Sequence, residues 1–493
     1  MAKSKNEIAR ASIKVNMPPT GILDPDKILN IIEYHKNKVR PRLEKLKRYY
    51  DTQHDILKRV LDDDKPNNKL IYDFPSYITD FQVGYFMGEK VSYSADDETY
   101  IKDLEELFKL TEEQGHNHKL AKNASIYGYA YEMLVYSERQ GKKVLDLFVL
   151  DPRGSILVYD TEKEDKEKPV ACITYSIIED ISTGKDIYNI EYINKTDIIK
   201  YVSQGEDNIL TVRDNIKHPF QDIPVVEYVN NPDRMGDFEN VISLIDAYNL
   251  VNSDDVNDIE YVNDAYLCLS GVSGFEEEFI EDEDEDGNPI EVPAPGKSVK
   301  DKLKDRVLIF PDSDSKAEWL LKNINDTHRE NVKNRLEKSI HKFSKTPDLN
   351  DESFAGNISG VAMKFKLIGT EQKIVDKEAA FRTSLRKRLE LLSNAEDKFK
   401  HDNLVDITFS RNLPINLTEV SDWASKLKGI ISNETLFSIM SFTTPQIEKE
   451  RIDKESEERK KNDDSDYMEM INSINKSKLE DQEAEEGEDL NNE

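Results

Sequence analysis

Residues 218–271, HPFQDIPVVEYVNNPDRMGDFENVISLIDAYNLVNSDDVNDIEYVNDAYLCLSG, decide the fold of this 493-residue chain. The run VVEYV at 225–229 is rich in β-branched and aromatic residues and predicts a strand. A helical pattern follows from about 237 to 267, with one apolar face made by Phe238, Val241, Ile245, Tyr248, Ile259, Val262 and Tyr266. About thirty helical residues would span ~45 Å, which is long for a helix of a single small core.

Two further helices follow in the direction of the C-terminus. The second is predicted over about 326–345, so the two helices flank a compact insertion and can pair antiparallel. A third is predicted from Val361 to about Lys400, with an apolar stripe made by Val361, Phe365, Ile368, Val375, Phe381, Leu385, Leu389 and Leu392. Helices of this length suggest lateral packing against copies of the same chain. The alternative is a large monomeric α+β protein.

The segment between the second and third helices, PDLNDESFAGNISG at 347–360, is predicted to be a loop because of its Pro, Gly, Asn and Asp content. Towards the N-terminus, short β-branched and aromatic runs separated by turn signals occupy about 126–230. Helical patterns precede them, and Gly88 is predicted to end one of these helices as a C′ glycine. The chain is therefore predicted to be α+β.

The chain is strongly acidic, with 68 basic and 99 acidic residues and a net charge of −31. Nine of the eleven residues in 276–286 are acidic, and residues 453–493 carry 16 acidic and 6 basic side chains. A simple DNA-binding protein is disfavoured, because Lys and Arg must neutralise phosphate in non-specific binding.

Membrane and secreted proteins are also disfavoured. No stretch approaches the ~18 apolar residues of a membrane span, and the N-terminal MAKSKNEIAR lacks the apolar centre of a signal peptide. Cys172 and Cys268 form no CxxC pair or disulfide framework and are interpreted as small packing residues.

The sequence offers no pattern for catalysis, a cofactor or a metal. P-loop, GxGxxG, HExxH and nucleophile-elbow motifs are absent. His116 and His118 do not share a helical face, so we interpret them as surface-loop residues. The acidic run at 282–287 resembles half of an EF-hand loop, but Pro293 stands where a bidentate Glu is required. We therefore expect no enzyme activity, cofactor or metal, and a solvated acidic loop.

Four segments together resemble one protein family. They are NNKLIYDFPSYITDFQVGYFMGEKVSYS (67–94), YGYAYEMLVY with VLDPRGSILVYD (127–160), residues 218–271, and ISGVAMKFKLIGTEQKIVDKEAAFRTSLRKRLELL (358–392). The most specific is the order G-D-F-E, L-I-D-A-Y-N, N-D-I-E and D-A-Y-L within 218–271. The chain resembles the portal (head-to-tail connector) proteins of tailed bacteriophages, in the branch common among phages of Gram-positive bacteria. Gly88-Glu89-Lys90 departs from this pattern, because Pro is expected after Gly-x.

The resemblance implies a ring of about twelve subunits at one capsid vertex, through whose channel double-stranded DNA enters and leaves. It also implies the following division: N-terminal helices and α/β wing, 1–236; stem helices, 237–268 and 326–346; a small α/β clip insertion, 269–325; tunnel loop, 347–360; long wing helix and return strand, 361–418; helical crown, 419–461; acidic disordered tail, 462–493.

The candidate DNA-contact residues follow from this division. Asn350, Asp351, Ser353 and Asn357 in the loop would touch DNA through small polar contacts. Lys342 and Lys345, at the end of the second stem helix, would touch its phosphate backbone. The alternative for the two lysines is that they only complement the dipole at the helix C-terminus.

The implied partners are the terminase, the major capsid and scaffolding proteins, and head-completion or tail-connector proteins, with no membrane. The implied location is the virion, after assembly in the host cytoplasm. The acidic tail would contact a basic scaffolding protein or be only solvated. Two alternatives stay open: an acidic host-interaction or DNA-mimic protein that forms no ring, and a metal-dependent nuclease using the carboxylates of 281–286.

Overall fold

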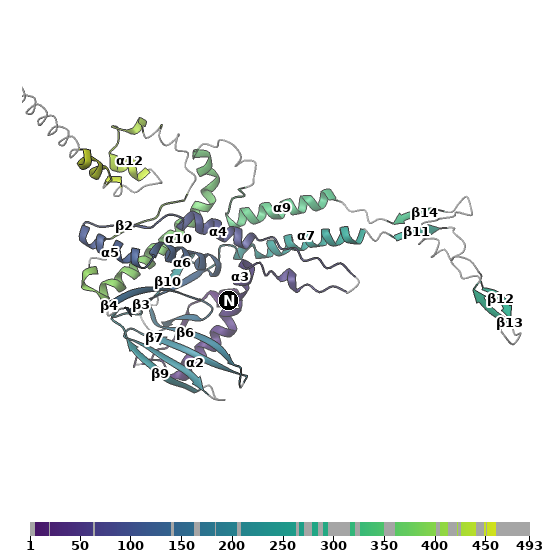
Figure 1. Ribbon diagram of the computed structural model, residues 1–493, viewed down its shortest axis with the longest axis horizontal. Helices are drawn as coiled ribbons and strands as arrows, with labels where there is room; N and C mark the ends of the chain where they lie inside the picture. Colours follow the sequence, from purple (N-terminus) through teal and green to yellow (C-terminus); the bar gives the residue numbers. More distant parts are fainter. Residues whose placement is uncertain are drawn as a thin grey trace, which may run out of the picture. The chain divides into compact units, whose positions relative to one another are not determined.

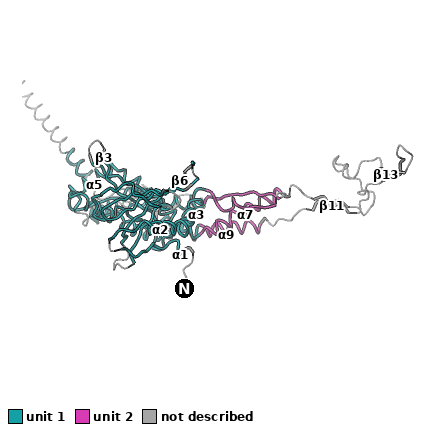
Figure 2. The backbone as a smooth tube through the Cα atoms, turned by 90° about the horizontal axis from the view of Figure 1, so that it is seen from below, with its two compact units in different colours: residues 1–51, 74–240, 341–493 teal, residues 52–73, 241–340 magenta. Residues whose placement is uncertain are grey.

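The computed structural model is α+β, as the sequence predicts, and divides into two compact units (Figure 2). Unit 1 comprises 1–51, 74–240 and 341–493, and unit 2 comprises 52–73 and 241–340. The residues that the structure describes are 5–18, 20–62, 65–139, 142–161, 168–182, 184–204, 209–262, 266–270, 279–283, 289–293, 316–320, 326–349, 360–400, 405–412, 422, 425–439, 448–449 and 451–459.

A six-stranded sheet in unit 1 has the order β1-β5-β6-β7-β8-β9. Its strands are β1 (Ile13–Val15), β5 (Ser155–Asp160), β6 (Pro169–Asp180), β7 (Lys185–Ile193), β8 (Asp197–Gln204) and β9 (Ile209–Lys217). Only the β1–β5 pair is parallel. Alternating side chains such as Ile173 and Tyr175 share a core with Ile28, Ile31 and Ile32 of α2 (Pro25–Tyr34).

A second sheet in unit 1 has the order β10-β3-β4 and lies above the first in Figure 1. Its strands are β10 (Val225–Val229), β3 (Tyr129–Arg139) and β4 (Lys142–Leu150). One core joins this sheet to helices from distant parts of the sequence. These are α4 (Phe74–Met87), α5 (Glu98–Leu110), α6 (Glu113–Tyr127) and α10 (Gly360–Ala395).

Smaller elements complete unit 1. A π-helical stretch, η1 (His35–Val39), joins α2 to α3 (Arg40–Tyr50), and α1 (Lys5–Arg10) precedes β1. The short strands β2 (Ser92–Ser94) and β15 (Asp406–Thr408) pair antiparallel. The remaining elements are the 3₁₀ turns η3 (Glu239–Val241) and η5 (Asp397–Phe399), and the helix α12 (Asn433–Ile439).

The predicted long third helix is confirmed as α10, although it ends at Ala395. Its apolar stripe is not buried along its whole length. Leu385, Leu389 and Leu392 are buried in the core, whereas Phe365 is 70% exposed and Ile368 and Val375 are also exposed. The first half of α10 therefore presents an apolar face that the described residues of the chain do not cover.

Unit 2 consists mainly of α7 (Ile242–Val262) and α9 (Asp326–Ser344), which run side by side (Figures 1 and 2). Arg329 of α9 binds Asp255 at 2.7 Å and also contacts Asp258, and Lys333 binds Asp255 at 2.9 Å. Farther along the chain are two antiparallel strand pairs, β11 (Tyr266–Ser270) with β14 (Lys316–Leu320), and β12 (Phe279–Glu283) with β13 (Pro289–Pro293). The prediction that two long helices flank an insertion and pair with each other is confirmed.

An extended segment of unit 2, residues 67–73, follows the 3₁₀ turn η2 (Asp55–Lys58) and is bound to α7 by side chains. The backbone N–H of Tyr72, Leu70 and Asn68 donates to Asn249 Oδ1, Ser253 Oγ and Asn257 Oδ1, at 2.9, 2.9 and 2.7 Å. Two extended residues rise ~6.6 Å and four helical residues rise ~6 Å. Every second backbone N–H of the segment therefore lies opposite every fourth residue of α7. We call residues 67–73 the strap.

Two sequence predictions are wrong in detail. The helical pattern over 237–267 ends at Val262, and Tyr266–Ser270 is a strand, because a short apolar run at the end of a helix does not distinguish the two states. Gly88 is not a left-handed C′ residue, since its φ is not positive. A Cβ there would lie 2.3 Å from the Gly84 carbonyl oxygen and 2.6 Å from Asn412, so close packing requires the glycine.

Candidate functional site

The predicted site residues are only partly within the described residues. Asn350, Asp351, Ser353 and Asn357 lie outside them. Lys342 and Lys345 are described, and both are exposed at the C-terminal end of α9. The site can therefore be built from α9 and from the segment that follows it as far as Leu349.

A Schellman turn ends α9. The Thr346 N–H donates to the His341 carbonyl oxygen at 3.1 Å, and Lys345 has a φ of +55°. This turn places one residue in the left-handed region, which glycine usually occupies because a Cβ is unfavourable there. The sequence has lysine at this position. The turn directs the chain out of the helix and leaves the Lys345 side chain exposed.

The segment after the turn is fixed by side chains of α4 and α10. Thr370 Oγ1 donates to the Lys345 carbonyl oxygen at 2.7 Å, and Gln82 Nε2 donates to Thr346 Oγ1 at 3.0 Å. The Tyr77 hydroxyl donates to the Pro347 carbonyl oxygen at 2.8 Å and accepts from the Leu349 N–H at 3.2 Å. Burial raises the pKa of Tyr77, so the phenol keeps its proton and can donate. Residues 345–349 therefore have a defined path.

Lys342 and Lys345 are available to bind an anion. Neither takes part in an ion pair with the described residues, although α9 has several such pairs earlier in the helix. Lys342 Nζ lies 5.9 Å from the centre of the Phe343 ring. Both the phosphate-contact interpretation and the helix-dipole interpretation fit this placement.

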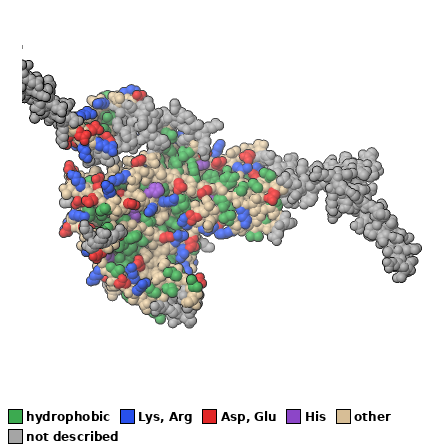
Figure 3. All heavy atoms as spheres, viewed as in Figure 1, with side chains coloured by type: hydrophobic (Ala, Val, Ile, Leu, Met, Phe, Trp, Pro, Cys, Tyr) green, Lys and Arg blue, Asp and Glu red, His purple; other side chains and the backbone are tan. Residues whose placement is uncertain are grey.

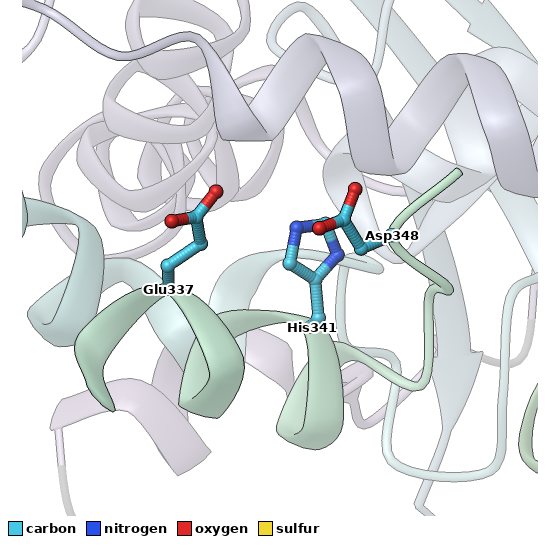
Figure 4. Close-up of side chains that lie close together, drawn as sticks. All are labelled: Glu337, His341 and Asp348. Carbon is cyan, nitrogen blue, oxygen red and sulfur yellow. The ribbon is translucent and has the colours of Figure 1, made fainter. Parts of the chain in front are cut away.

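Figure 4 shows Glu337 and His341 on successive turns of α9, with Asp348 in the segment that follows the helix. Carboxylate and imidazole are ligand types for divalent cations. The His341 ring, however, has structural contacts of its own. Its Nδ1–H donates to the Thr346 carbonyl oxygen at 3.1 Å, and the ring packs edge-on against Phe74 and Tyr77. These contacts give the His341 ring a structural role at the C-terminal end of α9.

A second polar cluster in unit 1 surrounds Asp237, and the sequence did not indicate it. Asp237 is fully buried and binds Lys377 Nζ at 2.7 Å and Lys373 Nζ at 2.9 Å. Gly236 allows the close approach, because a Cβ there would lie 2.4 Å from the Ile126 carbonyl oxygen at the end of α6. Burial alone would raise the pKa of Asp237, but the two lysines hold it well below its usual value.

A third cluster corrects the interpretation of His116 as a surface-loop residue. His116 is buried on α6, and its Nε2 lies 2.7 Å from Glu132 Oε1. The buried Arg388 of α10 binds Glu132 at 2.9 Å and Glu113 at 2.8 Å. Burial alone would raise the pKa of Glu132, but Arg388 and His116 lower it to about 2. This network joins α6, β3 and α10 inside the core and is structural.

The remaining chemical candidates also have structural roles. The described part of the acidic run, Phe279–Glu283, is a strand of the β12–β13 hairpin rather than the start of a helix–loop–helix. Cys172 is buried in β6, and burial raises the pKa of its thiol, as expected for a packing residue. Cys268, which directly follows the helical pattern predicted over about 237–267, is in β11. Within the described residues, no helix is both long and apolar enough to cross a bilayer.

Comparison with known proteins identifies the family to which this chain is similar. Residues 29–462 match the family described as phage portal protein, SPP1 Gp6-like. The chain is 24% identical over 420 residues to the portal protein of Clostridium phage phiCD119, which covers 80% of this chain and 88% of that protein. It is also 24% identical over 481 residues to the portal protein of Bacillus phage SPP1, covering 91% and 89%.

Proposed function

Because the chain belongs to the SPP1 Gp6-like family of phage portal proteins, we propose that it forms the ring-shaped DNA channel at one vertex of a phage capsid. The family match over 29–462 is the observation that carries this proposal. In this role the protein connects head to tail, receives DNA from a terminase during packaging and lets it leave on infection. The chain itself need not be an enzyme, because the terminase would supply the ATP hydrolysis.

The division of the chain follows the family. We assign the sheets and helices of 1–236 to the wing, 237–268 and 326–346 to the stem, and 269–325 to the clip that meets the terminase and later the connector proteins. Residues 347–360 are the tunnel loop, 361–418 the long wing helix and return strand, 419–461 the crown and 462–493 the acidic tail. Major capsid and scaffolding proteins are the other partners, in the virion and during assembly in the host cytoplasm.

One feature of the surface supports a ring, and a second feature suits a channel for DNA. Phe365, Ile368 and Val375 leave an apolar face of α10 uncovered, and such faces usually mark contacts with another protein. Acidic and basic side chains are interspersed over the drawn face of the molecule (Figure 3), although the whole chain has a net charge of −31. A channel built from such acidic chains would hold phosphate weakly, which suits DNA that must pass in either direction.

Light scattering and negative-stain imaging of the purified protein test the ring. We expect closed rings of about twelve subunits with a central hole, formed alone or on addition of the scaffolding protein. A protein that stays monomeric in both conditions contradicts the proposal. That result would favour the acidic host-interaction or DNA-mimic alternative, which the family match does not favour.

Within this channel, Lys342 and Lys345 are proposed to touch the DNA backbone, beside Asn350, Asp351, Ser353 and Asn357 of the loop. The support is that both lysines are exposed, carry no ion pair with described residues and precede the loop directly. Lys342→Ala with Lys345→Ala should lower packaged DNA several-fold while rings still form. Lys102→Ala with Lys109→Ala, two exposed lysines of α5, is the matched control. Unchanged packaging in the first pair would leave only the helix-dipole role.

A further inference from the structure

Residues 241–340 of unit 2 are joined to unit 1 at two places, which we call the crossings, and these places lie beside each other in unit 1. It leaves unit 1 after Asn240 and returns at His341. Asn240 Nδ2 donates to the Phe343 carbonyl oxygen at 2.8 Å, which joins the outgoing segment to the returning one. Asp237 precedes the first crossing, and Ser344, the last residue of α9, follows the second.

Lys373 of α10 binds both crossings with one ammonium group. Its Nζ lies 2.9 Å from Asp237 Oδ1, 3.0 Å from the Asp237 carbonyl oxygen and 3.4 Å from the Ser344 carbonyl oxygen. An ammonium group has three N–H donors and no acceptor, so these three oxygens match its capacity. The Ser344 carbonyl is also one of the four at a helix C-terminus that lack a partner within the helix.

One lysine would balance the single charge of the Asp237 carboxylate, but two lysines bind it. Lys377 is fully buried and binds Asp237 Oδ2 at 2.7 Å, which already balances the carboxylate. Ser125 Oγ and Asn230 Nδ2 donate to the same carboxylate at 2.6 and 2.9 Å. A second lysine adds an uncompensated charge, and burial together with that charge lowers the pKa of Lys377. The contacts of Lys373 with the two backbone carbonyls give this second cation a separate role.

Three side chains on one face of α10 hold these segments. Residues 370, 373 and 377 are spaced by three and four, so they share a helical face. Thr370 binds the Lys345 carbonyl oxygen at 2.7 Å, Lys373 binds the carbonyl oxygens of Asp237 and Ser344, and Lys377 binds the Asp237 side chain. We call Asp237, Asn240, Ser344, Lys373 and Lys377 the crossing junction.

We propose that Lys373 is a positioning residue that ties both chain crossings to α10 and thereby fixes the point from which the segment 347–360 begins. The proposal rests on the assignment of that segment to the DNA channel. When α10 moves, the outgoing crossing, the returning crossing and the start of the loop move with it as one body. Loss of Lys373 therefore weakens the attachment of the loop start to α10, leaving the contacts of Thr370, Gln82 and Tyr77, without removing the core that builds unit 1.

The test is Lys373→Met in the full-length protein, because methionine keeps a similar length and apolar stem but has no donor. Lys364→Met, an exposed lysine of the same helix, is the matched control, and Lys373→Arg restores donors. Hydrogen exchange should become at least tenfold faster in peptides covering 341–349 of Lys373→Met and stay unchanged in β3 and β4. Rings should retain the wild-type mass, packaged DNA should fall about tenfold, and Lys373→Arg should recover part of both effects.

Three results overturn the proposal. Residues 341–349 of Lys373→Met could stay as protected from hydrogen exchange as in the control. Alternatively, β3 and β4 could lose protection to the same extent, which would mean that the substitution lowers the stability of the whole fold. Faster exchange with unchanged packaging would also contradict a role in loop position. A wild-type protein that forms no ring refutes the proposed function instead, and the exchange experiment still decides whether Lys373 holds the crossings.

Discussion

A single residue at the end of α9 combines an unfavourable backbone conformation with an exposed charge. Lys345 has a φ of +55°, whereas a residue without a Cβ would occupy the same turn at lower cost. Strained backbone positions are often retained where the side chain has a function. The conformation and the proposed DNA contact can therefore be separated by mutation.

Replacing Lys345 with glycine should stabilise the fold and weaken packaging at the same time. Relief of the left-handed conformation is expected to raise the free energy of unfolding by about 1 kcal/mol, measured by urea denaturation followed by circular dichroism. Lys345→Ala removes the same charge but keeps the Cβ, so it should reduce packaging equally without the gain in stability. Equal stability of the two variants would show that the backbone position is unstrained.

The buried network around Arg388 makes a prediction about pH. Because the pKa of Glu132 is lowered to about 2 in the folded protein, Glu132 stabilises the fold at neutral pH. This contribution is complete above the pKa of the unfolded chain, near 4.5, and is lost as the pH falls towards 2. Glu132→Gln should cost about 3 kcal/mol at pH 7, because Arg388 loses one of its two carboxylates.

The difference between wild type and Glu132→Gln should then shrink between pH 4.5 and pH 2, measured by urea denaturation at each pH. Glu138→Gln, an exposed glutamate on the same strand, is the control and should cost less than about 0.5 kcal/mol. A Glu132→Gln penalty that does not change with pH would mean that the carboxylate is not ionised in the native network.

At the scale of elements, the strap is held by polar side chains of α7 rather than by a neighbouring strand. Ser253 accepts from the Leu70 N–H at 2.9 Å and donates to the Asn249 carbonyl oxygen at 2.7 Å. Ser253→Ala leaves the Leu70 N–H without this acceptor, at a cost of about 1 kcal/mol. We expect roughly fivefold faster hydrogen exchange at Leu70, with Ser243→Ala, an exposed serine of α7, as the control. Unchanged exchange would mean that another group protects this amide.

The elements also show what could be predicted from the sequence. The pairing of α7 with α9 and the existence of α10 follow from apolar spacing, which depends only on nearby residues. The strap and the crossing junction depend on partners 183 and 140 residues away, such as Leu70 with Ser253 and Asp237 with Lys377. An Asp before a helical pattern normally indicates a helix cap, so nothing near Asp237 in the sequence indicates a buried ion pair.

At the scale of the whole molecule, net charge opposes assembly. Each copy that joins a ring brings a charge of −31 close to the others, and this repulsion is screened by salt over a Debye length of ~10 Å at 0.1 M. If the contacts between copies are mainly apolar, as the exposed face of α10 suggests, salt should favour the ring. We expect the fraction of rings to rise when NaCl is increased from about 20 to about 300 mM, a range over which the Debye length falls severalfold.

Deleting residues 462–493, which contain 12 acidic and 2 basic residues, lowers the charge of each copy to −21 and should shift assembly to lower salt. The control is a tail of the same length in which Asn and Gln replace Asp and Glu, since it removes the charge but keeps the chain. Both variants should behave alike in analytical ultracentrifugation, because charge rather than tail length sets the repulsion. Rings that dissociate as salt rises would show instead that ion pairs between copies outweigh the net charge, and the apolar face of α10 would then lie outside the interface.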